Sequence, residues 1–355
     1  MANTYEIPTD KLEAYQKWLN DKDLQHIITE NVESGFWPNF DQSKINKLFL
    51  DEEDRHLEGW AANDYDIFFE LFREFEGNIP ANKPTEDYLF TQANKMFFTD
   101  CERAVTMIML LARHDYPKAL VRAAEILVSG DYLDSNFLAA GRYIERAANL
   151  GYDGCYAVLA YLQATGYGQT KRDLDKARET FQQALESNNP DNYHFIAVNY
   201  CVGSIVERDT ELAEKYFMKA LEAGYLDAAI TYFSFVHSQI IEDPTNNIMD
   251  ILEELGTLGY PGAMYKIGMF FIDLASLIVP KNGDPDVETD RMIKKAKIFL
   301  TIASNKNYTQ AFSILMKDSE YPKYDGRTYR LSDYTDLNLD LDPNESNGQK
   351  NFVMN

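Results

Sequence analysis

The stretch Ala-Ala-Asn-Leu-Gly-Tyr-Asp-Gly-Cys at residues 147–155 decides the fold, because its key residues return at regular intervals along the chain. Successive copies of its tyrosine position lie 35 to 37 residues apart, except for one interval of 48 residues before the last copy. Asn189 occupies the one copy that lacks the tyrosine. The tyrosines are Tyr116, Tyr152, Tyr225, Tyr260 and Tyr308. A constant period of this length indicates tandem repeats stacked as a solenoid.

Small residues recur three positions after each copy of the tyrosine position. They are Ala119, Cys155, Asn192, Ala228, Ala263 and Ala311. Apolar or small residues follow four and five positions later, which places all of them on one face of a helix. The last of these columns contains Ala124, Ala160, Ala197 and Gly268, and such small residues allow two helix backbones to approach closely. Three of these helices are expected to end at a glycine that adopts the left-handed conformation, namely Gly130, Gly166 and Gly203.

A second helix in each repeat is predicted to start at a polar residue. Its side-chain oxygen can accept a hydrogen bond from a free backbone N–H of the first turn. The candidate N-caps are Asp100, Asn136, Asp173 and Asp209. Alanine follows four residues later, and a second small or apolar column follows seven residues after that. This spacing predicts a stripe that packs against the first helix of the repeat.

These columns resemble the Sel-one-like repeat, a relative of the tetratricopeptide repeat. The clearest copies of its pattern are Ala147 to Gly151, and Asp175-Lys176-Ala177 with Phe181 and Ala184. The resemblance implies an all-α protein, a right-handed superhelical α-solenoid of helix–turn–helix repeats. It also implies a binding role, because the family consists mostly of adaptors and scaffolds.

Three segments are expected. Residues 1–84 do not fit the columns and are predicted to form an acidic N-terminal helical cap, with 18 acidic and 8 basic residues, hence a net charge of −10. Residues 85–318 hold the repeats, with turns near residues 116, 152, 189, 225, 260 and 308. Residues 319–355 are predicted to be an acidic, polar C-terminal tail.

Composition restricts the partners. The net charge of the chain is −23, which repels nucleic-acid phosphates and anionic membrane surfaces and favours a basic protein partner. No apolar run is long enough to cross a membrane, and the first residues do not look like a secretory signal, so we expect a cytoplasmic protein. Cys101, Cys155 and Cys201 are an odd number without metal-ligand spacing and are expected to be reduced core thiols.

The sequence contains none of the common nucleotide-binding, hydrolase or zinc-protease motifs. We therefore predict a protein that is not an enzyme and has no cofactor and no metal. The alternative is an enzyme with its site in residues 1–84 or at the junction between the cap and the repeats, where Glu52, Glu53 and Asp54 would act with His56. The spacing Glu53 to His56 also occurs in diiron proteins, but those need a second copy, so a solvated acidic helix start explains it more simply.

Three groups of residues are candidates for partner binding. Phe36, Trp37 and Phe40 lie in an aromatic loop, which either packs under the cap or anchors an interface. The carboxylates of Glu52, Glu53 and Asp54 form a compact acidic group. Residues 336–342 alternate Asp or Asn with Leu, so Asp336, Asp340 and Asp342 either belong to an extended tail or form an acidic strip that imitates phosphate toward a basic partner.

The sequence thus predicts a non-enzymatic protein-binding solenoid. The most specific hypothesis is a cytoplasmic immunity or inhibitor protein that neutralises a basic effector or toxin. A general adaptor, or a chaperone for effectors, is the alternative.

Overall fold

The computed structural model describes residues 86–334, except residues 169–170, 243–246, 278–284 and 324. The predicted N-terminal cap and the last part of the predicted tail lie outside the described residues. The described chain forms two compact units, one that runs to Ile251 and also includes Lys306–Tyr308, and one formed by Leu252–Asn305 and the residues from Thr309 onward.

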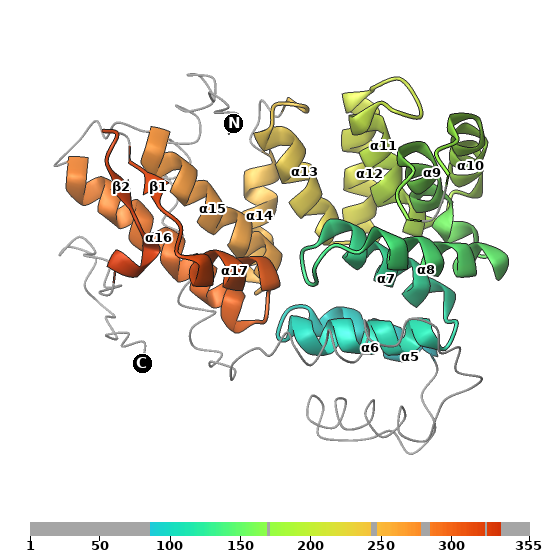
Figure 1. Ribbon diagram of the computed structural model, residues 1–355, viewed down its shortest axis with the longest axis horizontal. Coiled ribbons are helices and arrows are strands. Elements are labelled where there is room, and N and C mark those ends of the chain that lie inside the picture. The colour runs from blue at the N-terminus through green and yellow to red at the C-terminus, as the bar shows by residue number, and fades with distance from the viewer. Residues whose placement is uncertain (1–85, 169–170, 243–246, 278–284, 324, 335–355) are drawn as a thin grey trace, which may run out of the picture. The chain divides into compact units, whose positions relative to one another are not determined.

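The described chain is mostly helical, as the repeat columns predict (Figure 1). In the first unit they are α5 (Glu86–Met96), α6 (Cys101–Arg113), α7 (Pro117–Ser129), α8 (Phe137–Asn149), η1 (Asp153–Cys155), α9 (Tyr156–Thr165), α10 (Leu174–Ser187), η2 (Pro190–Asn192), α11 (Tyr193–Val202), α12 (Thr210–Glu222) and α13 (Asp227–His237). Helix α14 (Asn247–Thr257) follows. Helices α7, α9 and α11 pack against α8, α10 and α12, which are the second helices of their repeats.

The predicted helix ends are confirmed. All four polar N-caps accept from a backbone amide three residues later, with distances between 2.9 and 3.2 Å. Gly130, Gly166 and Gly203 end their helices in the left-handed conformation, with φ between 70 and 76°. Because glycine has no Cβ, it adopts this conformation without strain.

The predicted core stripe is also buried. The alanines of the second helices are fully excluded from solvent, and so are the larger residues between them. Within the first unit these larger residues are Ile108, Ile144, Phe181 and Phe217. The small column of the first helices is equally buried, and even the polar Asn192 has no exposed surface.

At the one repeat turn that lacks the tyrosine, Asn189 and Asn192 form hydrogen bonds with the preceding repeat. The Asn192 amide accepts from the Ala157 backbone N–H at 2.9 Å and donates to the Asp153 carbonyl at 2.9 Å. The Asn189 amide donates to the Asp153 carboxylate at 2.7 Å. The repeat that lacks the tyrosine is therefore tied to the preceding repeat by hydrogen bonds.

The second unit contains α15 (Pro261–Leu277), α16 (Pro285–Asn305) and α17 (Thr309–Lys317). Helices α15 and α16 have 17 and 21 residues and pack against each other. Much of the 48-residue interval is thus used to lengthen helices.

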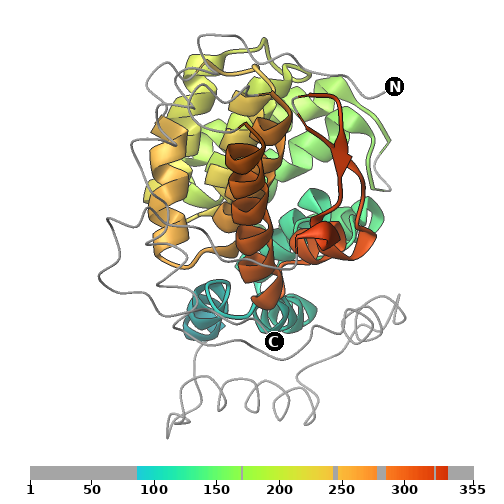
Figure 2. The same ribbon diagram turned by 90° about the vertical axis from the view of Figure 1, so that its left-hand side faces the viewer.

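A short antiparallel hairpin follows α17 and is the exception to the all-α prediction. Strand β1 (Tyr321–Pro322) pairs with β2 (Thr328–Tyr329), and η3 (Leu331–Asp333) follows; the hairpin is the red segment in Figures 1 and 2. Strand β1 contacts α15, and the Tyr334 carbonyl accepts from the Lys297 ammonium of α16 at 2.6 Å. The described part of the predicted tail thus packs on the last helices.

Candidate functional site

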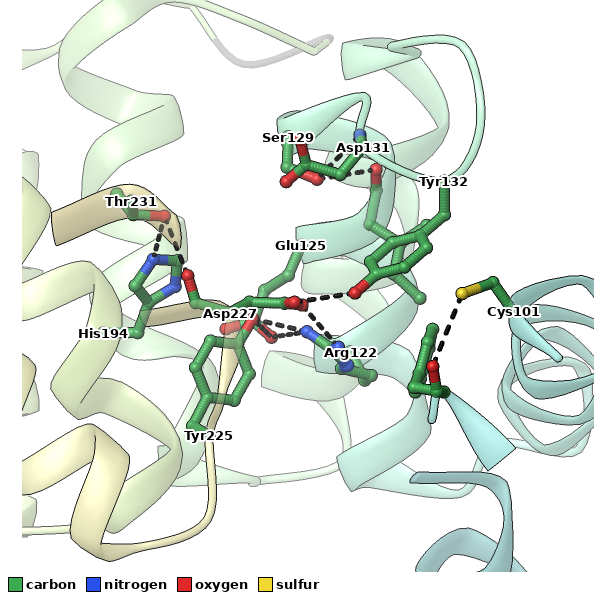
Figure 3. Close-up of polar contacts among 12 residues, drawn as sticks. Cys101, Arg122, Glu125, Ser129, Asp131, Tyr132, His194, Tyr225, Asp227 and Thr231 are labelled. Atoms are coloured by element: carbon green, nitrogen blue, oxygen red, sulfur yellow. Dashed lines mark hydrogen bonds and ion pairs between the residues drawn. The ribbon is translucent and has the colours of Figure 1, made fainter. Parts of the chain in front are cut away.

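The described residues include none of the nine predicted partner-binding residues. These are Phe36, Trp37, Phe40, Glu52, Glu53, Asp54, Asp336, Asp340 and Asp342, and they stay predictions. The described part of the chain shows instead a polar cluster inside the first unit, which we call the inner cluster. It consists of Arg122, Glu125, Tyr132, His194, Tyr225 and Asp227 (Figure 3).

The inner cluster joins repeats that are far apart in the chain. Arg122 and Glu125 lie one turn apart on α7, and Asp227 is the first residue of α13. The Arg122 Nη2 lies 2.5 Å from the Asp227 Oδ2, and the Tyr132 hydroxyl donates to the Asp227 Oδ1 at 2.7 Å. Helix α7 and the start of α13 are therefore in direct contact, although three repeat turns separate them.

A second set of hydrogen bonds runs through Tyr225. Arg122 Nη1 donates to the Tyr225 hydroxyl at 2.6 Å, and this hydroxyl donates to the Glu125 Oε2 at 2.7 Å. The guanidinium also lies 4.8 Å from the centre of the Tyr225 ring and 5.0 Å from that of Phe97, which adds a cation–π attraction. One arginine thus bridges α7, the Tyr225 turn and α13.

His194 of α11 lies at the edge of the inner cluster. Its Nε2 is 2.9 Å from the Thr231 hydroxyl of α13, and its ring lies 4.8 Å from the Tyr225 ring. Burial lowers the pKa of His194 to about 4, so the imidazole is neutral near pH 7. A neutral ring can pack against Tyr225 without bringing a third charge into the cluster.

Burial dominates the electrostatics of the other members. It raises the pKa of Glu125 to about 8, against the opposing effects of Arg122 and of the Tyr225 hydroxyl. Burial alone would lower the pKa of Arg122, but Asp227 and the neighbouring Tyr and Glu groups raise it well above its usual value. The cluster therefore contains a permanently charged arginine, an aspartate that pairs with it, and a glutamate that retains its proton at neutral pH.

The inner cluster extends to the turn between α16 and α17. The Tyr132 ring packs edge-on against Tyr308 at 5.3 Å and lies 4.7 Å from Phe97. Beside it, the Lys306 ammonium donates to the Phe98 carbonyl at 2.9 Å, and the Asn307 amide donates to the Asp100 carboxylate at 3.0 Å. A turn some 200 residues away in sequence thus completes the first unit.

Two further tyrosines of the repeat turns contact carboxylates. The Tyr116 hydroxyl donates to Asp87, and the Tyr152 hydroxyl donates to Asp191. The charge of Asp191 also acts on Tyr116, so the two contacts are neighbours. Together with Asp153, which Asn189 contacts, these residues form a set of turn carboxylates: Asp87, Asp153 and Asp191.

The inner cluster is a buried contact between repeats. The described residues hold no group of three or more His, Cys, Asp or Glu side chains that could bind a metal ion. All three cysteines are buried and reduced, and burial raises the pKa of the Cys155 and Cys201 thiols to about 12. Among the described helices, none combines the length and apolar character that a membrane crossing requires.

The sequence does indicate this cluster, through two charged residues at positions where the following repeats carry apolar or aromatic residues. Arg122 occupies a position where the next two repeats carry Val158 and Phe195. Glu125 has Tyr161 and Val198 as its counterparts. Two charged residues on the buried side of a first helix require partners, because an unpaired buried charge is costly.

Comparison with known proteins identifies the repeats. The family model of the Sel1 repeat matches three consecutive stretches, residues 117–152, 155–189 and 193–225. These stretches begin with α7, α9 and α11 and each include the second helix of the repeat. The chain therefore contains Sel1 repeats, and the resemblance seen in the sequence columns is confirmed.

Two solved structures are similar to this chain. One is a Sel1 repeat protein from Oxalobacter formigenes, with 17% sequence identity over 66% of this chain and 90% of that chain and a TM-score of 0.36. The other is a protective antigen of uropathogenic Escherichia coli strains that displays an SLR fold. It shares 15% identity over 77% of this chain and 58% of that chain, with a TM-score of 0.31. No match is found among curated proteins.

Proposed function

We propose that this chain is a non-enzymatic scaffold that binds a basic protein, and in its most specific form an immunity or inhibitor protein that neutralises a basic effector or toxin in the cytoplasm. The observation that carries the proposal is the combination of a Sel1-repeat solenoid with a net charge of −23. Sel1 repeats are generally protein-interaction scaffolds, and the excess of carboxylates favours a partner of opposite charge.

The turn carboxylates support a basic partner. Asp87 forms an exposed ion pair with Lys118 at 3.2 Å and keeps 73% of its side-chain surface accessible, and Asp153 and Asp191 are partly exposed. Asp153 and Asp191 lie at two successive repeat turns, and Asp87 of α5 contacts Tyr116 of the turn before them. A lysine or arginine of a partner would find carboxylates and tyrosine hydroxyls together there, and tyrosine is enriched in binding hot spots.

The inner cluster narrows the choice of binding surface. Arg122, Glu125 and Asp227 are less than 10% exposed, so a partner cannot reach them in this conformation. The exposed turn carboxylates and the acidic segments outside the described residues are the surfaces that we assign to the partner.

A general adaptor or an effector chaperone is the second candidate. The repeats themselves favour it, because they account for protein binding without any link to a toxin. The two candidates differ only in the partner.

Affinity purification with the intact chain tests the proposal at low and at high salt. We expect a basic protein, encoded near this chain, to be retained at about 50 mM salt and released at several hundred millimolar, because exposed charges are screened. Capture of an effector together with neutralisation of its activity identifies an inhibitor, and capture without neutralisation identifies an adaptor. If purified basic effectors from the same genome do not bind at low salt, the proposal fails.

Charge variants then locate the surface. The triple variant Asp87→Asn, Asp153→Asn, Asp191→Asn should weaken binding at least tenfold, because each lost ionic contact at an interface removes on the order of 1 kcal/mol. The matched control carries Asp175→Asn, Glu179→Gln and Glu186→Gln on α10, with the same change in net charge, and should bind nearly as tightly as the wild type. Deletion of residues 336–355 tests the tail and leaves the hairpin that packs on α15 intact.

A further inference from the structure

The inner cluster brings two carboxyl groups and one guanidinium into a place that water scarcely reaches. Arg122, Glu125 and Asp227 are 8%, 4% and 8% exposed. One guanidinium neutralises one carboxylate, so the second carboxyl group must either carry a buried, uncompensated charge or hold a proton. The uncompensated charge is far more costly in a protein interior.

The geometry decides which carboxyl group holds the proton. Asp227 forms the close ion pair with Arg122 at 2.5 Å and accepts from Tyr132 as well. Glu125 lies 3.8 Å from the Arg122 Nη1 and accepts one hydrogen bond, from Tyr225. Its Oε1 is buried and has no hydrogen-bond partner within the described part of the chain. In this buried position a protonated carboxyl group is less costly than an ionised one. The raised pKa of Glu125 is consistent with protonation.

The neighbouring groups compensate only in part for an ionised Glu125. The groups that face it are Arg122 on its own helix, Asp191 of η2, Tyr225 of the turn and Asp227 of α13, with His194 of α11 beyond the Tyr225 ring. Arg122 already pairs with Asp227, and both aspartates repel a second negative charge. His194 is neutral above its lowered pKa. Loss of the Glu125 proton therefore weakens the contact between α7 and the Tyr225 turn.

We propose that the inner cluster is a proton-dependent clasp, which joins α7 to the segment Tyr225–Asp227 while Glu125 is protonated and loosens when that proton passes to solvent. The clasp links the first and the fourth of the repeat turns that begin at Tyr116. It thus sets the curvature of the Sel1 repeats between residues 117 and 225. Opening exposes a carboxylate, a guanidinium and a tyrosine that the closed form hides.

Backbone hydrogen exchange of the full chain tests the clasp between pH 6.5 and 9, with rates corrected for the intrinsic effect of pH. Across this range His194 is neutral in the closed form, and in the opened form it carries charge only near the acid end of the range. In the wild type, opening of α7 and of residues 225–237 should increase by up to about tenfold per pH unit up to about pH 8 and then level off. In the opened form Glu125 ionises at its ordinary pKa, whereas in the closed form its pKa is raised to about 8. Between these two pKa values a rise in pH therefore favours the opened form.

Matched variants distinguish the clasp from a general effect of pH. Glu125→Gln should keep the closed form at every pH and remove the slope. Glu145→Gln, which removes an exposed carboxylate on α8, should behave as the wild type does. A wild type without a slope, or equal slopes in the wild type and Glu125→Gln, overturns the proposal.

A third variant keeps the test valid should Glu125→Gln not fold. Tyr225→Phe removes the hydroxyl that stabilises the ionised Glu125, so the slope should continue to a higher pH before it levels off. A levelling-off at the same pH as in the wild type contradicts the assignment of the proton to Glu125.

Discussion

Arg122 and Asp227 form an ion pair with an Nη2–Oδ2 distance of 2.5 Å, although Arg122 belongs to the first matched Sel1 repeat and Asp227 follows the third. Both residues are almost completely buried, each at 8% exposure. The contact therefore links the two ends of the matched repeats through groups that pay a desolvation penalty.

Removal of one partner should be strongly destabilising. Arg122→Met leaves the Asp227 charge buried without its cation, so we expect the free energy of unfolding to fall by about 3–5 kcal/mol. In the double variant Arg122→Met, Asp227→Asn the second substitution should restore part of this loss. Urea unfolding of the wild type, both single variants and the double variant at pH 7 gives the coupling energy.

The exposed pair Arg178–Asp175 on α10 provides the control for this cycle. Its side chains are 56% and 94% exposed, and such pairs contribute between about 0 and 1 kcal/mol. Equal coupling energies in the two pairs would contradict a special role for the buried one.

His194 should make the protein less stable on the acid side of neutrality. Its folded-state pKa is lowered by burial from 6.5 to about 4, so the unfolded chain binds a proton that the folded chain does not bind. The stabilising contribution is complete above about pH 6.5 and is lost as the pH falls toward 4, with a slope of up to about 1.4 kcal/mol per pH unit. Thermal unfolding of the wild type between pH 4.5 and 7 measures this loss.

The variant His194→Gln should remove that slope, because glutamine does not titrate and can still reach the Thr231 hydroxyl. His237→Gln, which replaces a half-buried histidine at the end of α13, serves as the control. If His194→Gln loses stability in acid as steeply as the wild type does, another group carries the acid sensitivity.

The sequence predicted those parts of the fold that depend on neighbouring residues. The N-caps, the left-handed glycines and the alanine columns follow from local geometry and from packing between adjacent helices, and both repeat with the period of the chain. The period of the repeated tyrosine does not show how each copy is used. Tyr260 and Tyr308 are core residues with 2% and 1% exposure, whereas Tyr116, Tyr152 and Tyr225 use their hydroxyls to contact carboxylates.

The inner cluster could not be predicted in the same way. Which turns meet three repeats apart depends on the curvature of the array, which is the sum of small rotations that no single column encodes. The replacement of apolar residues by Arg122 and Glu125 indicated buried charges, but it did not identify Asp227 as the partner. The hairpin at residues 321–329 was also not predicted, because its two-residue strands are too short to show an alternating pattern.

The N-cap of α10 tests whether the recurring position of the polar cap in each repeat stabilises the protein. Asp173 accepts from the Lys176 backbone amide at 3.0 Å, so Asp173→Ala should lower the free energy of unfolding by about 1 kcal/mol. Asp175→Ala removes the same charge from an exposed position in the first turn of the same helix and should cost less than about 0.5 kcal/mol. Urea unfolding compares the two, and equal losses would assign the effect to charge and not to the cap.

Gly268 tests the close approach of α15 and α16. A Cβ at this position would lie 3.0 Å from the Leu300 Cγ and 3.2 Å from the Ala296 carbonyl oxygen. In a solvent-exposed helix, glycine to alanine stabilises by about 0.5–1 kcal/mol. Here the added methyl group meets a side chain and a backbone atom of the other helix, so Gly268→Ala should cost about 1–3 kcal/mol.

The double variant Gly268→Ala, Leu300→Ala shows whether crowding causes that cost. Leu300→Ala alone should destabilise by about 2–5 kcal/mol because it leaves a cavity in a fully buried site. The same substitution makes room for the new Cβ, so the two changes together should cost less than the sum of their separate effects. Additive losses, or a stabilised Gly268→Ala variant, would mean that α15 and α16 can separate enough to accept the methyl group, and that Gly268 does not limit their distance.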